Sequence, residues 1–193
     1  FELRIPGGDA DVDLPLPGRH NVMNALAGAA CGVALGLDAA QIATGLQQVQ
    51  AAQGRVVWKH TAAGARLIDD SYNANPTSMQ AGLELLAQQP GRRWAVLGAM
   101  AELGPTSASL HAEVGARARA LGIDRLCSVG PAAADYARGW GKGAEVFDDL
   151  DALAATLSPQ LEVGVTVLVK GSRSARMEAL VAAWSGTDAT ETH

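Results

Sequence analysis

Five short apolar runs, separated by stretches with helical spacing, constrain the fold of this 193-residue chain more than any other feature. The runs are RLIDD (66–70), RWAVLG (93–98), RLCSVG (125–130), AEVF (144–147) and VTVLVKG (165–171). Helical patterns follow them, most clearly at Met177, Leu180 and Trp184, which share one helix face. Nearly continuous apolar strands joined by helices are typical of a parallel sheet that is covered on both faces. The sequence therefore predicts an α/β fold with a mostly parallel, Rossmann-like sheet over residues 53–186.

Residues 1–52 show a different pattern. Two alternating stretches, FELRI (1–5) and VDLPL (12–16), flank a turn at Pro6–Asp9 and predict a hairpin. Helical spacing follows over 18–36, with Asn21 expected as the N-cap and Gly36 as the end, and a second helix is expected from about 38 to 49. We expect a small α+β unit here, a domain boundary near 51–54, and a flexible tail over 187–193.

Composition and charge exclude several classes of protein. Apolar residues make up 48% of the chain and charged residues 18%, which is typical of a folded globular protein. The net charge of -5 gives no basic surface for a nucleic acid. No apolar run approaches the roughly 18 residues needed for membrane insertion. Cys31 and Cys127 lack disulfide or metal spacing, so we expect two buried free thiols in a cytoplasmic protein.

Polar loops follow the predicted strands at the sheet edge where ligands bind in such folds. In DDSYNANP (69–76), two carboxylates follow a buried strand, and Asn75 with the next proline should begin a helix. A carboxylate there can accept hydrogen bonds from both hydroxyls of a ribose. The alternative is that Asp69 or Asp70 only caps a turn. The neighbouring Tyr72 and Asn73 favour a ligand site.

A second polar loop, KGSRS (170–174), ends the last predicted strand just before a helix. Its ammonium, guanidinium and hydroxyl groups suit a carboxylate or a phosphate. The alternative is that Lys170 and Arg173 are solvated and that Ser174 only caps the helix. We expect the loops at 70–75 and 170–174 to lie side by side on one rim of the sheet, lining a shared cleft.

A third polar segment, PGRHNVMN (17–24), places His20 and Asn24 on one helix face, where they can bind the edge of a base. The alternative is that His20 is a structural cap. The sequence contains neither a G-x-x-x-x-G-K-[ST] phosphate loop nor a G-x-G-x-x-G motif after a strand. Because no His, Cys or Asp cluster has zinc spacing, no metal site is predicted from the residues.

Several of these segments, taken in order, resemble the Mur ligase family: PGRHNVMNALA, GR at 54–55, LIDDSYNANPTSM and VLVKGSRSARME. VLGAMAELG (96–104) and LGIDRLCSVG (121–130) fit the same order, so the resemblance covers residues 11–184. DDSYNANP and VLVKGSRS narrow it to the ligase that joins D-alanyl-D-alanine to UDP-N-acetylmuramoyl-tripeptide. In this chain Ala99 stands where the family usually has aspartate, and the family's phosphate loop is missing.

The resemblance implies that residues 1–52 are the end of a central ATP-binding domain and 53–186 the C-terminal domain. It implies an ATP-dependent ligase of peptidoglycan precursor synthesis that forms an acyl phosphate with ATP and Mg²⁺, the magnesium ligands lying mostly outside this sequence. The chain alone is expected to be inactive. A hinge near 51–54 would bring Arg55 to the phosphates when the domains close.

The resemblance also implies site residues. ATP is expected to be bound by His20, Asn21, Asn24, Arg55 and Asp70. D-alanyl-D-alanine is expected to be bound by Tyr72, Asn73, Asn75, Lys170, Ser172 and Arg173, with catalytic roles for Arg55 and Lys170.

Two other interpretations remain open at this stage. One is a non-catalytic Rossmann-like module that binds a nucleotide or an anion without turnover. The other is another amide ligase of the superfamily, such as a folylpolyglutamate or cyanophycin synthetase, against which the KGSRS loop argues.

Overall fold

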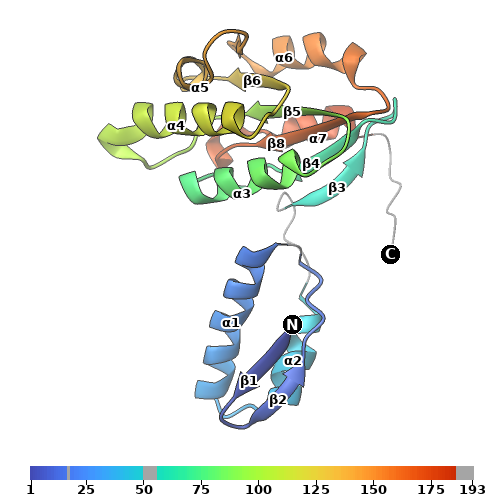
Figure 1. The fold of residues 1–193 in the computed structure, drawn as a ribbon, viewed down its shortest axis with the longest axis vertical. Helices are drawn as coiled ribbons and strands as arrows, with labels where there is room; N and C mark the ends of the chain where they lie inside the picture. The colour runs from blue at the N-terminus through green and yellow to red at the C-terminus, as the bar shows by residue number, and fades with distance from the viewer. Residues whose placement is uncertain (17, 50–55, 186–193) are drawn as a thin grey trace. The chain divides into compact units, whose positions relative to one another are not determined.

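The computed structural model describes residues 1–16, 18–49 and 56–185 (Figure 1). The chain divides into two compact units, Phe1–Ala52 and Gln53–His193, and each is described by itself. Within the described residues, no helix has both the length and the apolar character that a membrane span requires.

The first unit combines a hairpin with two helices, as predicted. Its elements are β1 (Glu2–Ile5), β2 (Gly8–Asp11), α1 (Arg19–Ala34) and α2 (Ala39–Gln47). The strands pair antiparallel from Glu2 with Asp11 to Ile5 with Gly8. The prediction placed the second strand at 12–16, which was wrong, because the two residues Pro6 and Gly7 suffice to close the turn.

The start of α1 also differs from the prediction. Asn21 is not the N-cap: Gly18 holds that position with φ 100°, and the Asn21 N–H donates to the Gly18 carbonyl at 3.0 Å. A glycine at positive φ lets the chain enter the helix earlier than a side-chain cap would. The predicted end was right, since Gly36 follows the helix with φ 82°. Asp38 caps the start of helix α2, because its carboxylate accepts the Gln41 N–H at 2.9 Å.

The second unit contains a six-stranded sheet in its described part, in the order β3-β4-β8-β5-β6-β7. All five predicted runs are strands: β4 (Arg66–Asp70), β5 (Arg92–Leu97), β6 (Arg125–Val129), β7 (Glu145–Phe147) and β8 (Val165–Lys170). Neighbours among these five pair in parallel, whereas β3 (Val57–His60) is an antiparallel edge strand that was not predicted. The predicted fold class, a mostly parallel α/β sheet, is confirmed.

Helices cover both faces of this sheet, as Figure 1 shows. One face packs against α3 (Pro76–Ala87), α4 (Ser107–Ala120) and α5 (Ala133–Trp140). The other packs against α6 (Leu150–Leu157) and α7 (Glu178–Trp184). Successive strand residues serve opposite cores: Leu67 belongs to the α6/α7 core and Ile68 to the α3/α4/α5 core. Asp69 and Asp70 extend the same strand, so they do not follow it as predicted.

The two cysteines lie in different surroundings. Cys127 is buried in β6, as predicted, whereas Cys31 is exposed on α1. The prediction for Cys31 was wrong because α1 is buried only along the face that carries Ala25 and Ala29, and Cys31 lies off that face.

Candidate functional site

The carboxyl ends of β4, β8 and β5 meet at one edge of the sheet. Asp70 at the end of β4 pairs with Lys170 at the end of β8, and Lys170 pairs with Leu97 of β5 on its other side. The segments 71–75 and 171–174 therefore leave the sheet side by side. The expectation that these polar loops share one rim is confirmed.

A buried ion pair ties the two loops together. The Lys170 Nζ atom lies 2.6 Å from Asp70 Oδ2 and donates to the Asn73 carbonyl at 2.9 Å. Lys170 is only 1% exposed, so the interpretation of a solvated lysine is wrong. Helix α3 closes over the pair: a Cβ atom at Gly82 would lie 3.4 Å from Lys170 Cδ and 3.6 Å from Asp70 Oδ2. Each charge in such a buried pair compensates the other, so the loss of either partner would leave an unpaired charge in the core.

The loop 71–75 is shaped by its own asparagines. Asn75 caps α3 as predicted: its Oδ1 accepts the Ser78 N–H at 2.8 Å, and Pro76 follows at the first helical position. The Asn73 Oδ1 accepts the Ala74 N–H at 2.8 Å. Both asparagines are exposed, with their amide oxygens already used to hold the loop.

The loop 171–174 differs from the prediction at its far end. Ser174 does not cap a helix, because a 3₁₀ turn, η3 (Arg173–Ala175), and a left-handed Arg176 precede α7. Ser172 is buried; its N–H donates to the Ala99 carbonyl at 2.8 Å, and its hydroxyl lies 3.0 Å from the Ser174 hydroxyl.

A cleft of about 470 Å³ opens beside this rim, between β3, β4 and α7. Its size is within the range of small-molecule sites, about 300 to 1,000 Å³. It is lined by Val57, Lys59, Asp69, Ser71, Tyr72, Arg173, Glu178, Val181 and Ala182. Of the predicted substrate residues, the cleft brings together Tyr72 and Arg173, whereas Asn73, Asn75, Lys170 and Ser172 lie outside its lining.

The cleft contains both signs of charge. Lys59 Nζ lies 3.1 Å from Asp69 Oδ2, and the other Asp69 oxygen accepts the Ser71 hydroxyl at 2.6 Å. Arg173 is exposed, with a guanidinium nitrogen 3.5 Å from Glu178 Oε1. Among the described residues, Glu178 Oε2 is a buried oxygen without a hydrogen-bond partner. The cleft therefore offers two cations and two carboxylates within one small volume.

Sequence reasoning missed Lys59 and Glu178. Lys59 lies on the edge strand β3, whose four residues VWKH alternate between half-buried and exposed and gave too weak a strand pattern. In the sequence, Glu178 is simply a charged residue in the first turn of a predicted helix, and nothing near it indicates a site. Only the fold brings both residues into one cleft with Arg173.

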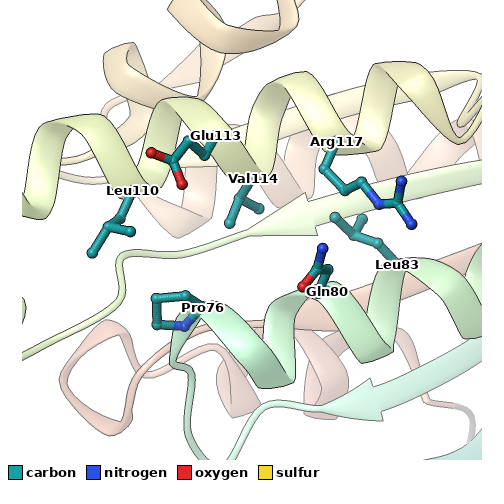
Figure 2. A pocket seen from close by; sticks show the side chains of 7 residues that line it. All are labelled: Pro76, Gln80, Leu83, Leu110, Glu113, Val114 and Arg117. Atoms are coloured by element: carbon teal, nitrogen blue, oxygen red, sulfur yellow. The ribbon is translucent and has the colours of Figure 1, made fainter.

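A second cavity lies between α3 and α4, on the opposite face of the sheet. Figure 2 shows its side chains approaching from the two helices: Pro76, Gln80, Leu83, Leu110, Glu113, Val114 and Arg117. Its volume of about 90 Å³ is well below the range of small-molecule sites. The larger cleft at the strand ends is therefore the stronger candidate site.

The structure describes only some of the residues that were predicted to bind ATP. Asn21 and Asn24 lie in α1, where the Asn24 amide donates to Asn21 Oδ1 at 3.4 Å. Asp70 is the buried partner of Lys170. The His20 side chain, Arg55, the predicted hinge at 51–54 and the predicted tail at 187–193 lie outside what the structure describes. Across the described ranges, no group of three or more His, Cys, Asp or Glu side chains is arranged to hold a metal ion.

Comparison with known proteins identifies the family of this chain. The family model described as Mur ligase, glutamate ligase domain, matches residues 54–173. The chain belongs to the Mur ligase family. Its match begins at the second structural unit and ends in the KGSRS loop, so it includes most of the cleft.

Among curated relatives of this Mur ligase chain, the UDP-N-acetylmuramoyl-tripeptide–D-alanyl-D-alanine ligase of Escherichia coli K12 is 46% identical over 185 residues. That alignment covers 95% of this chain and 41% of the relative. The same ligase of Haemophilus influenzae is 34% identical, with 94% and 40% covered. The chain thus spans about two fifths of the length of these relatives.

Solved structures agree with this assignment. MurF from Acinetobacter baumannii superposes with a TM-score of 0.81 at 37% identity, over 95% of this chain and 41% of that one. MurF from Thermotoga maritima, solved in complex with ADP, gives a TM-score of 0.71 at 25% identity, over 94% and 44%. A bifunctional folylpolyglutamate synthase/dihydrofolate synthase gives 0.66 at 21% identity, a likeness of fold alone.

Proposed function

We propose that this chain is the part of a MurF-type ligase that binds D-alanyl-D-alanine and presents its amine to an acyl phosphate of UDP-N-acetylmuramoyl-tripeptide. The observation that carries the proposal is the shared rim: the loops at 70–75 and 170–174 are tied together by Asp70 and Lys170 beside a charged cleft. The 46% identity to the E. coli ligase of this specificity supports the choice of substrate.

The charges of the cleft match those of the dipeptide. D-alanyl-D-alanine is a zwitterion with one carboxylate, one amino group and two methyl groups. Arg173 can bind the carboxylate with two parallel hydrogen bonds, and Lys59 adds a second cation in the same cleft. Asp69 and Glu178 supply oxygens for the amino group, while Val181 gives an apolar surface for a methyl group.

The ammonium group of the dipeptide must lose a proton before its nitrogen can attack. In the proposed step the nitrogen bonds to the acyl carbon, the carbon–oxygen bond to phosphate breaks, and inorganic phosphate leaves with the second proton that the nitrogen gives up as the amide forms. The Glu178 carboxylate lines the cleft beside Arg173, and we assign it the role of taking this first proton. Holding the dipeptide by its carboxylate orients the amine for this attack and replaces water near the acyl phosphate.

The remaining predicted substrate residues support the cleft in this proposal. The Arg173 guanidinium lies 6.0 Å from the centre of the Tyr72 ring, which helps to orient it. Lys170 holds Asp70 and the Asn73 carbonyl, and so fixes the loop that carries Tyr72. Asn75 begins the helix behind that loop.

We also propose that ATP is the phosphoryl donor, because the T. maritima MurF was solved with ADP and shares this fold. The roles of His20, Asn21, Asn24, Arg55 and Asp70 toward ATP remain predictions. The described residues do not form a magnesium site, so no step through Mg²⁺ is assigned to this chain.

The test is a chimaera in which this chain replaces the matching part of the E. coli ligase. It should release phosphate only when D-alanyl-D-alanine and UDP-N-acetylmuramoyl-tripeptide are both present. Arg173→Ala should raise KM for the dipeptide about 10- to 100-fold, the value of a charge-assisted hydrogen bond, and change KM for ATP less than about 2-fold. The KM of Arg173→Lys for the dipeptide should lie between that of the unsubstituted chimaera and that of Arg173→Ala.

Two results would count against this function. An active chimaera in which both KM values rise equally would remove Arg173 from the dipeptide site. Phosphate release that is indifferent to the dipeptide would favour a module that binds a nucleotide or anion.

A further inference from the structure

The segment Gly98–Met100, which follows β5, lies against the KGSRS loop. The Gly98 N–H donates to the Lys170 carbonyl at 2.8 Å, and the Ala99 carbonyl accepts the Ser172 N–H at 2.8 Å. These two bonds make the segment 98–100 the immediate support of the loop that carries Arg173.

Two buried side chains hold this segment from the other side. His111 of α4 accepts the Met100 N–H at Nε2, 2.9 Å away, and Tyr136 of α5 donates its hydroxyl to the Gly98 carbonyl at 2.9 Å. Both are fully buried, and their rings meet edge to face with centroids 4.8 Å apart. Helices α4 and α5 thus each contribute one buried polar group that hydrogen-bonds to the segment 98–100.

The surroundings of His111 and Tyr136 define where each side chain carries its proton. Because the Met100 N–H can only donate, His111 Nε2 must accept, so its proton is on Nδ1 and is donated to the Ser107 carbonyl at 2.7 Å. Burial raises the pKa of Tyr136, so its hydroxyl stays protonated and remains a donor.

Close packing leaves the segment little room to move. A Cβ atom at Gly98 would lie 2.7 Å from Met177 Sδ, and one at Gly171 would lie 2.6 Å from Met177 Cγ. The two glycines therefore let the segments at 98 and 171 approach each other beneath the start of α7. With its backbone groups bonded as well, the segment can hold Ser172 in one position.

We propose that His111 and Tyr136 are positioning residues for the ligase reaction, acting through the 98–100 segment on Ser172 and the loop that carries Arg173. This inference rests on the function proposed above. Neither residue lines the described cleft. Their effect on the dipeptide is therefore indirect, and it runs through the Ala99 carbonyl and the Ser172 N–H.

The first test needs no turnover. In the 193-residue chain, Tyr136→Phe keeps the ring but leaves the Gly98 carbonyl without its donor. Amide hydrogen exchange at Ser172 should become at least about 10-fold faster, since loss of a buried hydrogen bond loosens the local structure by that order. The Arg92 N–H, bonded to Gly164 at the other end of β5, should be unaffected. Unchanged exchange at Ser172 would overturn the proposal.

The second test uses the chimaera with the E. coli ligase. Tyr136→Phe and His111→Phe should each raise KM for D-alanyl-D-alanine about 5- to 10-fold and leave KM for ATP within about 2-fold. His111→Gln keeps an acceptor near Met100 and should recover part of the loss. Leu161→Val, a core change near the amino end of β8, is the control for general destabilisation and should change neither KM.

The outcomes separate this inference from the proposed function. An unsubstituted chimaera without turnover contradicts the proposed function, and the exchange test still decides whether the two side chains hold Ser172. An active parent whose variants raise both KM values alike, or behave like Leu161→Val, contradicts the inference alone.

Discussion

The buried pair of Lys170 and Asp70 gives a prediction whose size follows from the structure. Lys170 is 1% exposed, and its ammonium lies 2.6 Å from the carboxylate. Lys170→Met keeps an unbranched side chain of nearly the same length but removes the ammonium. The Asp70 carboxylate is then left buried without its cation. Removing one partner of a buried ion pair costs about 3 to 5 kcal/mol. For a unit of this size, that lowers Tm by roughly 10 to 20 °C.

The assay is urea and thermal unfolding of the 193-residue chain, followed by circular dichroism. The double variant Lys170→Met with Asp70→Asn should be more stable than Lys170→Met alone, because no buried charge remains unpaired. Arg117→Met is the control: its guanidinium also contacts a carboxylate, that of Glu84, but the two side chains are 43% and 48% exposed, so the loss should stay below about 1 kcal/mol. The reasoning is refuted if Lys170→Met costs no more than Arg117→Met, or if the two losses in the double variant simply add.

Two further predictions concern titratable groups. Burial raises the pKa of Cys127 to about 12, so in the native chain a thiol reagent at pH 8 should label Cys31 alone, and in urea both; two labelled thiols in the native chain would contradict the burial of β6. Burial also acts to raise the pKa of Asp124, but hydrogen bonds from the Arg93 side chain and N–H outweigh it, and the pKa lies below its ordinary value. A lowered pKa stabilises the fold above about pH 4 and loses this effect as the pH falls through the folded-state pKa. Asp124→Asn should therefore cost about 0.5 kcal/mol at pH 7, a value discounted for solvent exposure, and less at pH 3. Equal losses at both pH values in urea unfolding would contradict this assignment.

Much of the fold could be predicted because it depends on local patterns. The strand β8 is buried along its whole length, so it appears in the sequence as an uninterrupted apolar run. Asn75 and Pro76 predict the start of α3, because a side-chain cap and a fixed φ act within one turn. The shared rim follows from topology, since parallel strands end at the same edge.

The rest depends on contacts between distant residues. Lys170 was expected to bind the dipeptide, and its buried partner Asp70 could not be predicted because it lies 100 residues away in the sequence. His111 appears as a single histidine in a helix, and nothing near it in sequence indicates a bond to the Met100 backbone. The cleft needs Lys59, which lies on a strand too short and too exposed to be predicted.

The central claim is that D-alanyl-D-alanine binds at the carboxyl ends of β4 and β8. The most direct measurement is a titration of the isotopically labelled 193-residue chain with D-alanyl-D-alanine, followed by the amide NMR shifts. We predict saturable shifts at Ser71, Tyr72 and Arg173, abolished by Arg173→Ala. Shifts confined to Gln80 and Glu113, in the cavity between α3 and α4, or no shifts at saturating dipeptide, would contradict the claim.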